Sequence, residues 1–159
     1  MAALQQKLPY IRSLSALDGQ GKIHISTDPA NVGLLLLLGE LQHSVAPGAA
    51  GVLRFGHPWR GRNFADGTPW PRHREGGLVV DSGFFPVTLV LPGAPQWTLL
   101  ATINSDYFIN LALNHQTSVA LRYSVYSDDG TLLFSTNENA QPGTLMPRAE
   151  ALQDILERQ

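Results

Sequence analysis

The sequence predicts an α+β domain in which an antiparallel sheet of about five strands is flanked by helices. Short runs of alternating apolar and polar residues predict strands with one buried face, and stretches rich in glycine, proline and aspartate separate them. Hydrophobic residues make up 43% of the 159 positions, which is enough for a core, whereas the low share of charged residues, 15%, argues against a disordered chain. The length suits one domain, or one domain and part of another.

The first predicted element is a β-hairpin over residues 10–27. Gly21 suits the position with positive φ that follows a type I turn, and Asp18 can accept a backbone hydrogen bond there. The apolar run that follows predicts a short buried helix over residues 34–45. On the outgoing strand, alternation would place four side chains on one face, namely Tyr10, Arg12, Leu14 and Ala16.

Three more strands are predicted at residues 50–55, 84–91 and 97–103. The segment 56–83 between the first two of these is longer than the roughly 12–15 residues beyond which loops become uncommon. Such a loop is either functional or disordered, and its aromatic residues favour order. These aromatic residues are Trp59, Phe64 and Trp70.

The second half of the chain predicts a helix, a hairpin and a last helix. The first helix would begin at Ser105 or Asp106, and residues 119–136 then alternate as two strands around a turn. Residues 148–158 form an amphipathic pattern whose stripe could pack on the sheet or pair with a partner chain. The stripe consists of Ala149, Leu152, Ile155 and Leu156.

One hairpin occurs twice in the sequence. LDGQGKIHIST (17–27) and YSDDGTLLFST (126–136) align without a gap at an offset of 109 residues, which matches Gly21 with Gly130. Each copy ends in a further glycine, Gly33 and Gly143, after a shift of one residue. Any hairpin with an acidic turn looks similar, so the order of the surrounding elements is what favours an internal repeat.

This order resembles that of double-Cache (PDC-type, PAS-like) extracytoplasmic sensor domains. LPYIRSLSALDGQGKIHISTDPANVG is similar to the opening hairpin of their distal module, and LRFGHPWRGRNFADG, FFPVTLVL and WTLLATINSDYFINLAL are similar to its third to fifth strands. The resemblance implies a distal module over residues 1–118, with its N-terminal helix largely missing. Residues 119–159 would open a second, membrane-proximal module, or would complete the first.

The resemblance also implies a function. The chain would be the input domain of a bacterial receptor, on the periplasmic or extracellular side of the inner membrane, and would bind a small molecule, an anion being one option. The output would be a diguanylate cyclase, a phosphodiesterase or a histidine kinase. The receptor would be membrane-anchored, although this chain holds no run of about 20 apolar residues and no signal peptide. The alternative is a cytosolic PAS-like domain that acts by homodimerisation without a ligand.

The ligand site is expected under the long segment. Five of the eleven basic residues lie within residues 54–74, where only Asp66 opposes them, and arginine pairs well with carboxylates. We expect the segment to cover the sheet as a lid, or else to be a solvated loop whose tryptophans seal the sheet edge. The candidate ligand-binding residues in the lid are Trp59, Arg60, Arg62, Asp66 and Trp70.

Three more candidates lie on or next to the predicted strands. Asn104 and Asp106 stand where the fifth strand meets the helix, and in the resembled family an acidic residue near this junction commonly holds a ligand's amino group. Asn104 is the best match to that position, which weakens the case for an amino-acid ligand. Asp106 could instead cap the helix, and Phe85 could line the cavity or belong to the core.

Other classes of function have little support. The net charge of −2 argues against a nucleic-acid partner, and the absence of cysteine excludes disulfides and thiolate sites. The five histidines show no i, i+4 pair, and the motifs of hydrolases, zinc proteases and nucleotide-binding loops are missing. We therefore expect no enzymatic activity, no metal and no cofactor.

Overall fold

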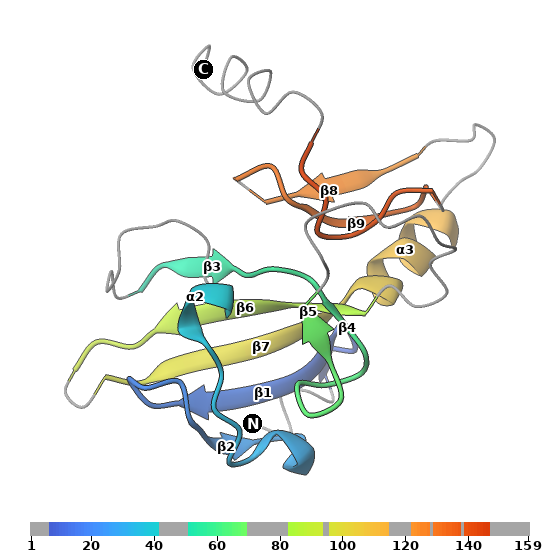
Figure 1. Cartoon of the computed structure of the whole chain (residues 1–159). Coiled ribbons are helices and arrows are strands. Elements are labelled where there is room, and N and C mark those ends of the chain that lie inside the picture. Colours follow the sequence, from blue (N-terminus) through green and yellow to red (C-terminus); the bar gives the residue numbers. More distant parts are fainter. Residues whose placement is uncertain are drawn as a thin grey trace.

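The structure, a computed structural model, describes residues 7–41, 51–69, 83–93, 96–114, 122–127, 129–137 and 139–146. Within these residues, seven strands form one curled antiparallel sheet, and two more strands form a separate hairpin (Figure 1). The elements are β1 (Ile11–Leu17), β2 (Ile23–Ser26), η1 (Pro29–Asn31), α2 (Leu38–Leu41), β3 (Leu53–Phe55), β4 (Trp59–Arg60), β5 (Thr68–Pro69), β6 (Phe84–Val90), β7 (Thr98–Asn104), α3 (Ser105–Asn114), β8 (Ser124–Tyr126) and β9 (Leu132–Ser135).

The predicted α+β class is confirmed, but the strand count differs. The strands lie in the order β2-β1-β7-β6-β4-β5, and β3 also pairs with β6. The two additional strands, β4 and β5, have two residues each and lie within the segment predicted to be a loop. Alternation over two residues is too short to be recognised, so these strands are defined by their pairing, of β4 with β6 and of β5 with β4. The predicted helix 148–158 lies outside the described residues.

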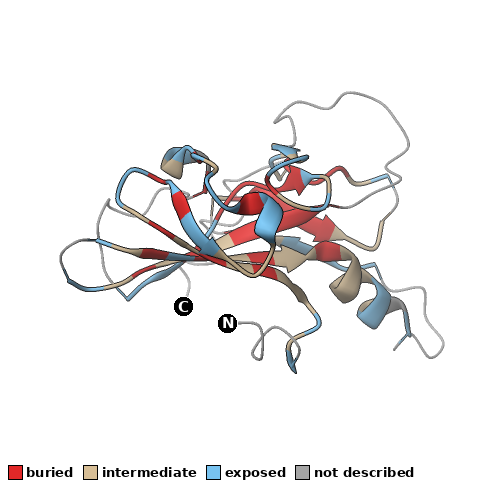
Figure 2. Ribbon diagram, turned by 90° about the horizontal axis from the view of Figure 1, so that it is seen from below, coloured by how far each residue is buried: buried red, intermediate tan, exposed pale blue. Residues whose placement is uncertain are grey.

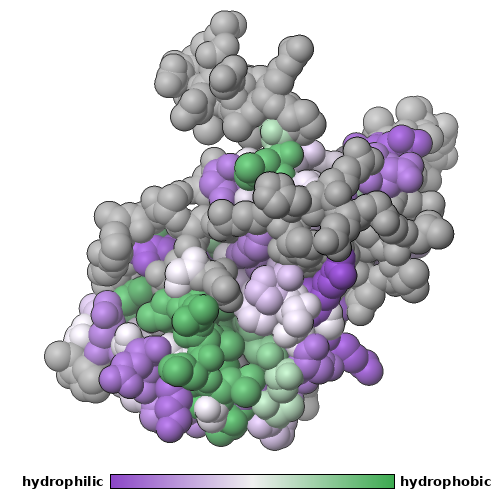
Figure 3. Space-filling model, viewed as in Figure 1, coloured by the Kyte–Doolittle hydropathy of each residue, from purple (hydrophilic) through white to green (hydrophobic). Residues whose placement is uncertain are grey.

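The helix predicted over residues 34–45 begins only at Leu38, so the first four of the five consecutive leucines lie outside it. The backbone at residues 34–36 is extended because it pairs with the first hairpin: Ile23 N–H donates to Leu34 O at 2.9 Å, and Leu36 N–H donates to Gly21 O at 3.0 Å. Alternate side chains therefore point inward and outward, with Leu36 buried and Leu35 and Leu37 exposed. Figure 3 shows apolar side chains gathered on the surface around α2, which begins only at Leu38.

The sheet has two differently covered faces. We call the face that carries Ser13, Ser15 and Leu17 the inner face, and the opposite one the outer face. The inner face is covered by α2 and by residues 61–67, and Figure 2 shows that many buried residues lie on the central strands. The apolar core on this side consists of Leu17, Ile23, Leu36, Leu41, Trp59, Phe64, Phe84 and Leu100.

The second hairpin packs on one end of the outer face. The ring of Phe134 in β9 stacks on Phe85 of β6 at 6.2 Å and on Phe108 of α3 at 5.6 Å, measured between ring centroids. Leu133 completes this small core. Among the described residues, β8 and β9 pair only with each other, so this hairpin does not extend the large sheet.

The two hairpins are built from the same hydrogen bonds. Gly21 N–H donates to Asp18 O at 3.0 Å, and Gly130 N–H donates to Ser127 O at 3.0 Å. In both copies a pair of serine hydroxyls joins the strands at 2.9 Å, Ser15 with Ser26 and Ser124 with Ser135. The strand register also slips at equivalent positions, Ala16/Leu17 and Val125/Tyr126. The backbone geometry thus supports the internal repeat.

The repeat extends into the loop after each hairpin. Gly33 N–H donates to Ile23 O at 2.8 Å, and Gly143 N–H donates to Leu132 O at 2.8 Å. The offset has changed from 109 to 110 residues, because one residue is inserted between the second hairpin and its closing glycine. That residues 119–159 open a second module stays a prediction.

The side chain of Asp18 organises the first turn. Its Oδ1 accepts hydrogen bonds from the backbone N–H groups of Gln20 and Lys22 at 2.9 and 3.0 Å, and its Oδ2 lies 2.7 Å from His24 Nε2. The hydrogen bond with His24, followed by that from Lys22 N–H, lowers the pKa of Asp18 below its ordinary value. The ionised form is therefore the one that holds the turn.

Substitution of Gly21 and Gly33 by alanine separates backbone strain from lack of space. Their φ angles are nearly the same, +89° and +88°, but a Cβ on Gly21 would overlap the carbonyl oxygen of Leu36, whereas the space around Gly33 is open. We expect Gly33→Ala to cost about 1–2 kcal/mol of unfolding free energy through φ alone, and Gly21→Ala to cost more, by about 1–3 kcal/mol. Urea unfolding measures both, and equal losses would contradict this account.

Acid should weaken the Asp18 turn. Because the folded pKa lies below the unfolded one, the carboxylate contributes its full stability above the unfolded pKa, and that contribution is lost as pH falls through the folded pKa. The melting temperature of the native chain should therefore exceed that of Asp18→Asn near neutral pH, and the difference should shrink in acid. A difference that stays constant down to the acid end of the titration would refute the role given to the carboxylate.

Candidate functional site

Cross-strand pairs arrange the inner face in rows. At the end nearest α3, Trp59 of β4 lies opposite Phe84 of β6, which lies opposite Asn104 of β7. The remaining pairs place many hydroxyl-bearing side chains on the inner face. The next two rows are Pro86, Thr102 and Ser13, and then Arg54, Thr88, Leu100, Ser15 and Ser26.

A buried hydrogen-bond network joins this face to the residues that cover it. Ser13 Oγ lies 2.8 Å from Thr102 Oγ1, and Asn31 Nδ2 donates to Ser13 Oγ at 3.5 Å. Asn31, which is fully buried, also accepts a hydrogen bond from Phe64 N–H at 3.1 Å through Oδ1. The loop after the first hairpin therefore holds Phe64 over the sheet.

Carboxylates hold the rest of the covering loop. Asp66 Oδ1 accepts hydrogen bonds from the backbone N–H groups of Arg62 and Asn63 at 3.3 and 3.2 Å. Asn63 Nδ2 donates to Asp28 Oδ2 at 3.0 Å. Residues 61–67 are thus tied both to themselves and to the exit of the first hairpin, as a cover of the inner face requires.

Trp59 is the buried aromatic residue of the first row. Its ring stacks on Phe84 at 6.2 Å and meets Phe64 edge-on at 5.0 Å. The indole Nε1 is buried and has no hydrogen-bond partner among the described residues, and the same is true of the hydroxyl of Thr88. An unsatisfied buried polar group costs about 1–3 kcal/mol, so these two groups are the points where a bound molecule would gain most.

Arg12 gathers three groups at the same end of the face. Its Nη2 donates to Asn104 Oδ1 at 2.8 Å and lies 3.3 Å from Asp106 Oδ2, while Nη1 donates to Gly61 O at 3.0 Å. The pairing of β1 with β7 slips between Ile11 and Ser13, which leaves Arg12 in a β-bulge. A strict alternation, which predicts Arg12 beside Leu14, cannot foresee such a bulge.

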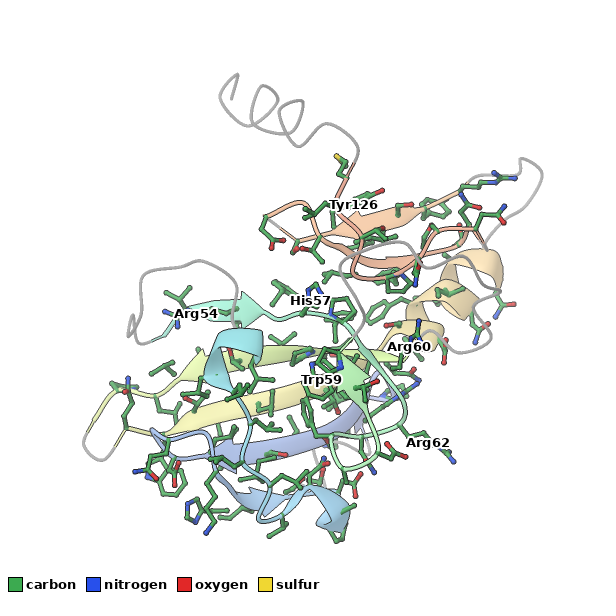
Figure 4. All side chains as sticks on the ribbon, in the orientation of Figure 1. Arg54, His57, Trp59, Arg60, Arg62 and Tyr126 are labelled. Carbon is green, nitrogen blue, oxygen red and sulfur yellow. The ribbon has the colours of Figure 1, made fainter. Side chains whose placement is uncertain are left out.

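The candidate residues of the lid do not share one surface. Trp59 belongs to the inner face, whereas Arg60, Arg62 and Asp66 are exposed, and Figure 4 shows Arg62 directed away from the sheet. Asp66 acts as the acceptor that closes its own loop. Trp70 lies outside the described residues.

The remaining candidates divide between the two faces. Asn104 lies in the same row as Trp59, and Arg12 joins it to Asp106. Phe85 lies on the outer face, where it stacks on Phe134, because neighbouring residues of a strand point to opposite sides and Phe84 points inward. Phe85 is therefore separated from Trp59 by the sheet.

Several inner-face residues were not foreseen as site residues. Arg54 lies opposite Thr88 and is 3% exposed. Its position between Leu53 and Phe55 predicts the reverse, with the two apolar side chains buried and the arginine exposed. A usable signal was the presence of small hydroxyl residues at positions where alternation calls for apolar ones. They include Ser13, Ser15 and Thr102.

Comparison with known proteins identifies the fold. No protein-family model matches the chain, and no curated protein matches its sequence. The structure is similar to the extracellular domain of a protein described as a histidine kinase, rpHK1S-Z16, with a TM-score of 0.69 and 19% sequence identity. The match covers 98% of this chain and 59% of that one.

The chain therefore has the fold of a known extracellular domain along almost its whole length, and it spans somewhat more than half of that neighbour. In the part of the chain that the structure describes, no helix is both long and apolar enough to cross a membrane. The assignment to the double-Cache type stays a prediction.

Removal of the Asn31 side chain should loosen the cover. Asn31→Ala leaves the buried N–H of Phe64 without an acceptor, so we expect a loss of about 2–3 kcal/mol of unfolding free energy. Gln141 is the counterpart in the second hairpin and is buried to a similar degree, at 8% exposure. Gln141→Ala should lower the unfolding free energy, measured by tryptophan fluorescence, by less than about 1 kcal/mol. Equal losses in the two variants would contradict the role of Asn31 in holding residues 61–67 over the inner face.

Proposed function

We propose that this chain is the extracytoplasmic sensor domain of a membrane receptor, and that it binds a small molecule against the inner face of its sheet. The observation that carries the proposal is the buried Nε1 of Trp59, which has no hydrogen-bond partner among the described residues. Trp59 shares a row with Asn104, in a fold that is similar to the extracellular domain of a protein described as a histidine kinase. A buried polar group without a partner calls for an explanation, and a bound molecule would supply one here.

The covering loop supports the same proposal. Phe64 lies over the inner face and contacts Trp59, and its backbone N–H donates to the buried side chain of Asn31. A ligand that contacts Trp59 would interact better with the conformation in which residues 61–67 are closed. Binding would then shift the population toward that conformation.

The signal would leave through α3. Arg12 joins the loop, through Gly61 O, to the residues at the start of α3, through Asn104 and Asp106. Phe108 of α3 in turn stacks on Phe134 of the second hairpin. A displacement of residues 61–67 would thus be transmitted to the second hairpin. From there it would be passed to an output domain such as a histidine kinase, a diguanylate cyclase or a phosphodiesterase. We place the chain in the periplasm or outside the cell.

A thermal-shift screen of organic acids and amino acids tests the proposal, because a ligand that binds only the folded chain raises its melting temperature. Trp59→Phe keeps the aromatic contacts and removes the Nε1 donor, so the affinity for the best compound should fall about tenfold. Trp97→Phe is the matched control, since Trp97 packs on His24, away from the first row. If the chain acts by dimerisation alone, no compound will raise its melting temperature, and the proposal fails. An affinity that is the same in Trp59→Phe and in the native chain would contradict the role of Trp59.

A further inference from the structure

Arg12 determines which atoms Asn104 presents. Its Nη2 lies 2.8 Å from the Oδ1 of Asn104. The guanidinium group has only hydrogen-bond donors. The amide atom of Asn104 that faces it must therefore be the oxygen, because the amide nitrogen is also a donor. The two N–H donors of Nδ2 therefore point away from Arg12, and one of the two lone pairs of Asn104 Oδ1 is taken up by the guanidinium.

The surroundings of Asn104 are rich in donors as well. Trp59 Nε1, which can only donate, belongs to the same row, and Phe84 separates the two residues. With strands about 4.8 Å apart, the backbones of Trp59 and Asn104 lie about 10 Å from each other, a distance that one small molecule spans.

Negative charge on this face is scarce. The inner-face positions of the described strands carry no carboxylate. The nearest acidic residue along the chain, Asp106, lies 3.3 Å from Arg12, which offsets its charge. An ammonium group placed beside Asn104 would meet the N–H donors of Nδ2, whereas a carboxylate or carbonyl oxygen would accept hydrogen bonds from them.

We propose that the inner face selects its ligand by an oxygen acceptor at Asn104, so that the ligand is an organic acid without an amino group at that end and not an amino acid. This inference rests on the proposed function, since it assumes that a small molecule binds the inner face. Arg12 is in this view a positioning residue, because it acts on the ligand through Asn104.

Pairs of compounds that differ by one amino group provide the test. Succinate is compared with aspartate, and glutarate with glutamate, by thermal shift and by calorimetry on the whole chain. We expect the member without the amino group to bind about tenfold more tightly or better, because the amino group would leave donors facing donors. Tighter binding of the amino member would overturn the inference while leaving the proposed function in place.

Two variants test the residues themselves. Asn104→Asp replaces the outward-facing donors by an acceptor, so the preference should shrink or reverse. Arg12→Met frees the amide to rotate and should also reduce the preference. Arg62→Met is the matched control, because Arg62 is exposed and lies on the covering loop, and the preference should not change.

The outcomes separate the two proposals. An unchanged preference in Asn104→Asp would overturn the role of Asn104. If Arg12→Met does not fold, the inference is still tested by the ligand preference of the native chain and by that of Asn104→Asp. If the native chain bound neither member of either pair and no compound in the wider screen, the proposed function would fall and this inference with it.

Discussion

The antiparallel pairing of β1 with β7 is the contact on which the rest of the structure depends. It joins residues 11–17 to residues 98–104, which are far apart in the sequence, and it brings the first hairpin into the large sheet. The hydroxyls of Ser13 and Thr102 meet because of it, and so do the side chains of Arg12 and Asn104. Without this pairing, neither the buried polar network nor the junction at α3 would form.

The second hairpin shows what the same local structure does without such a partner. Its turn, its serine pair and its closing glycine repeat the hydrogen bonds of the first hairpin. Among the described residues, however, β8 has no counterpart of β7, and the hairpin is held instead by Phe134 against Phe85 and Phe108. Local sequence is therefore sufficient for the hairpin, and its surroundings decide how it is attached.

The bulge in β1 determines which charged and polar groups meet at the end of the inner face nearest α3. By breaking the alternation, the bulge allows Arg12 to reach a side chain on the neighbouring strand, a carboxylate on α3 and a carbonyl on the covering loop. One donor-only group thereby neutralises Asp106 and orients Asn104. The chemical character of this end of the face thus depends on one residue that lies outside the loop rich in arginine.

Local patterns in the sequence predicted the three long strands, the turn of each hairpin with its glycine, and a start of α3 at Ser105 or Asp106, because alternation and turn chemistry act over a few neighbouring residues. Tertiary structure decided the rest. Pairing with β6 created β4, and pairing with β4 created β5. Pairing with the first hairpin kept residues 34–36 extended, and the bulge redirected Arg12. Alternation placed Phe84 and Phe85 on opposite sides but could not say which side faces the covering loop. Which side each ring faces is decided by contacts between distant parts of the chain. Phe84 packs against Trp59 and Phe64 on the inner face, and Phe85 packs against Phe134 on the outer face.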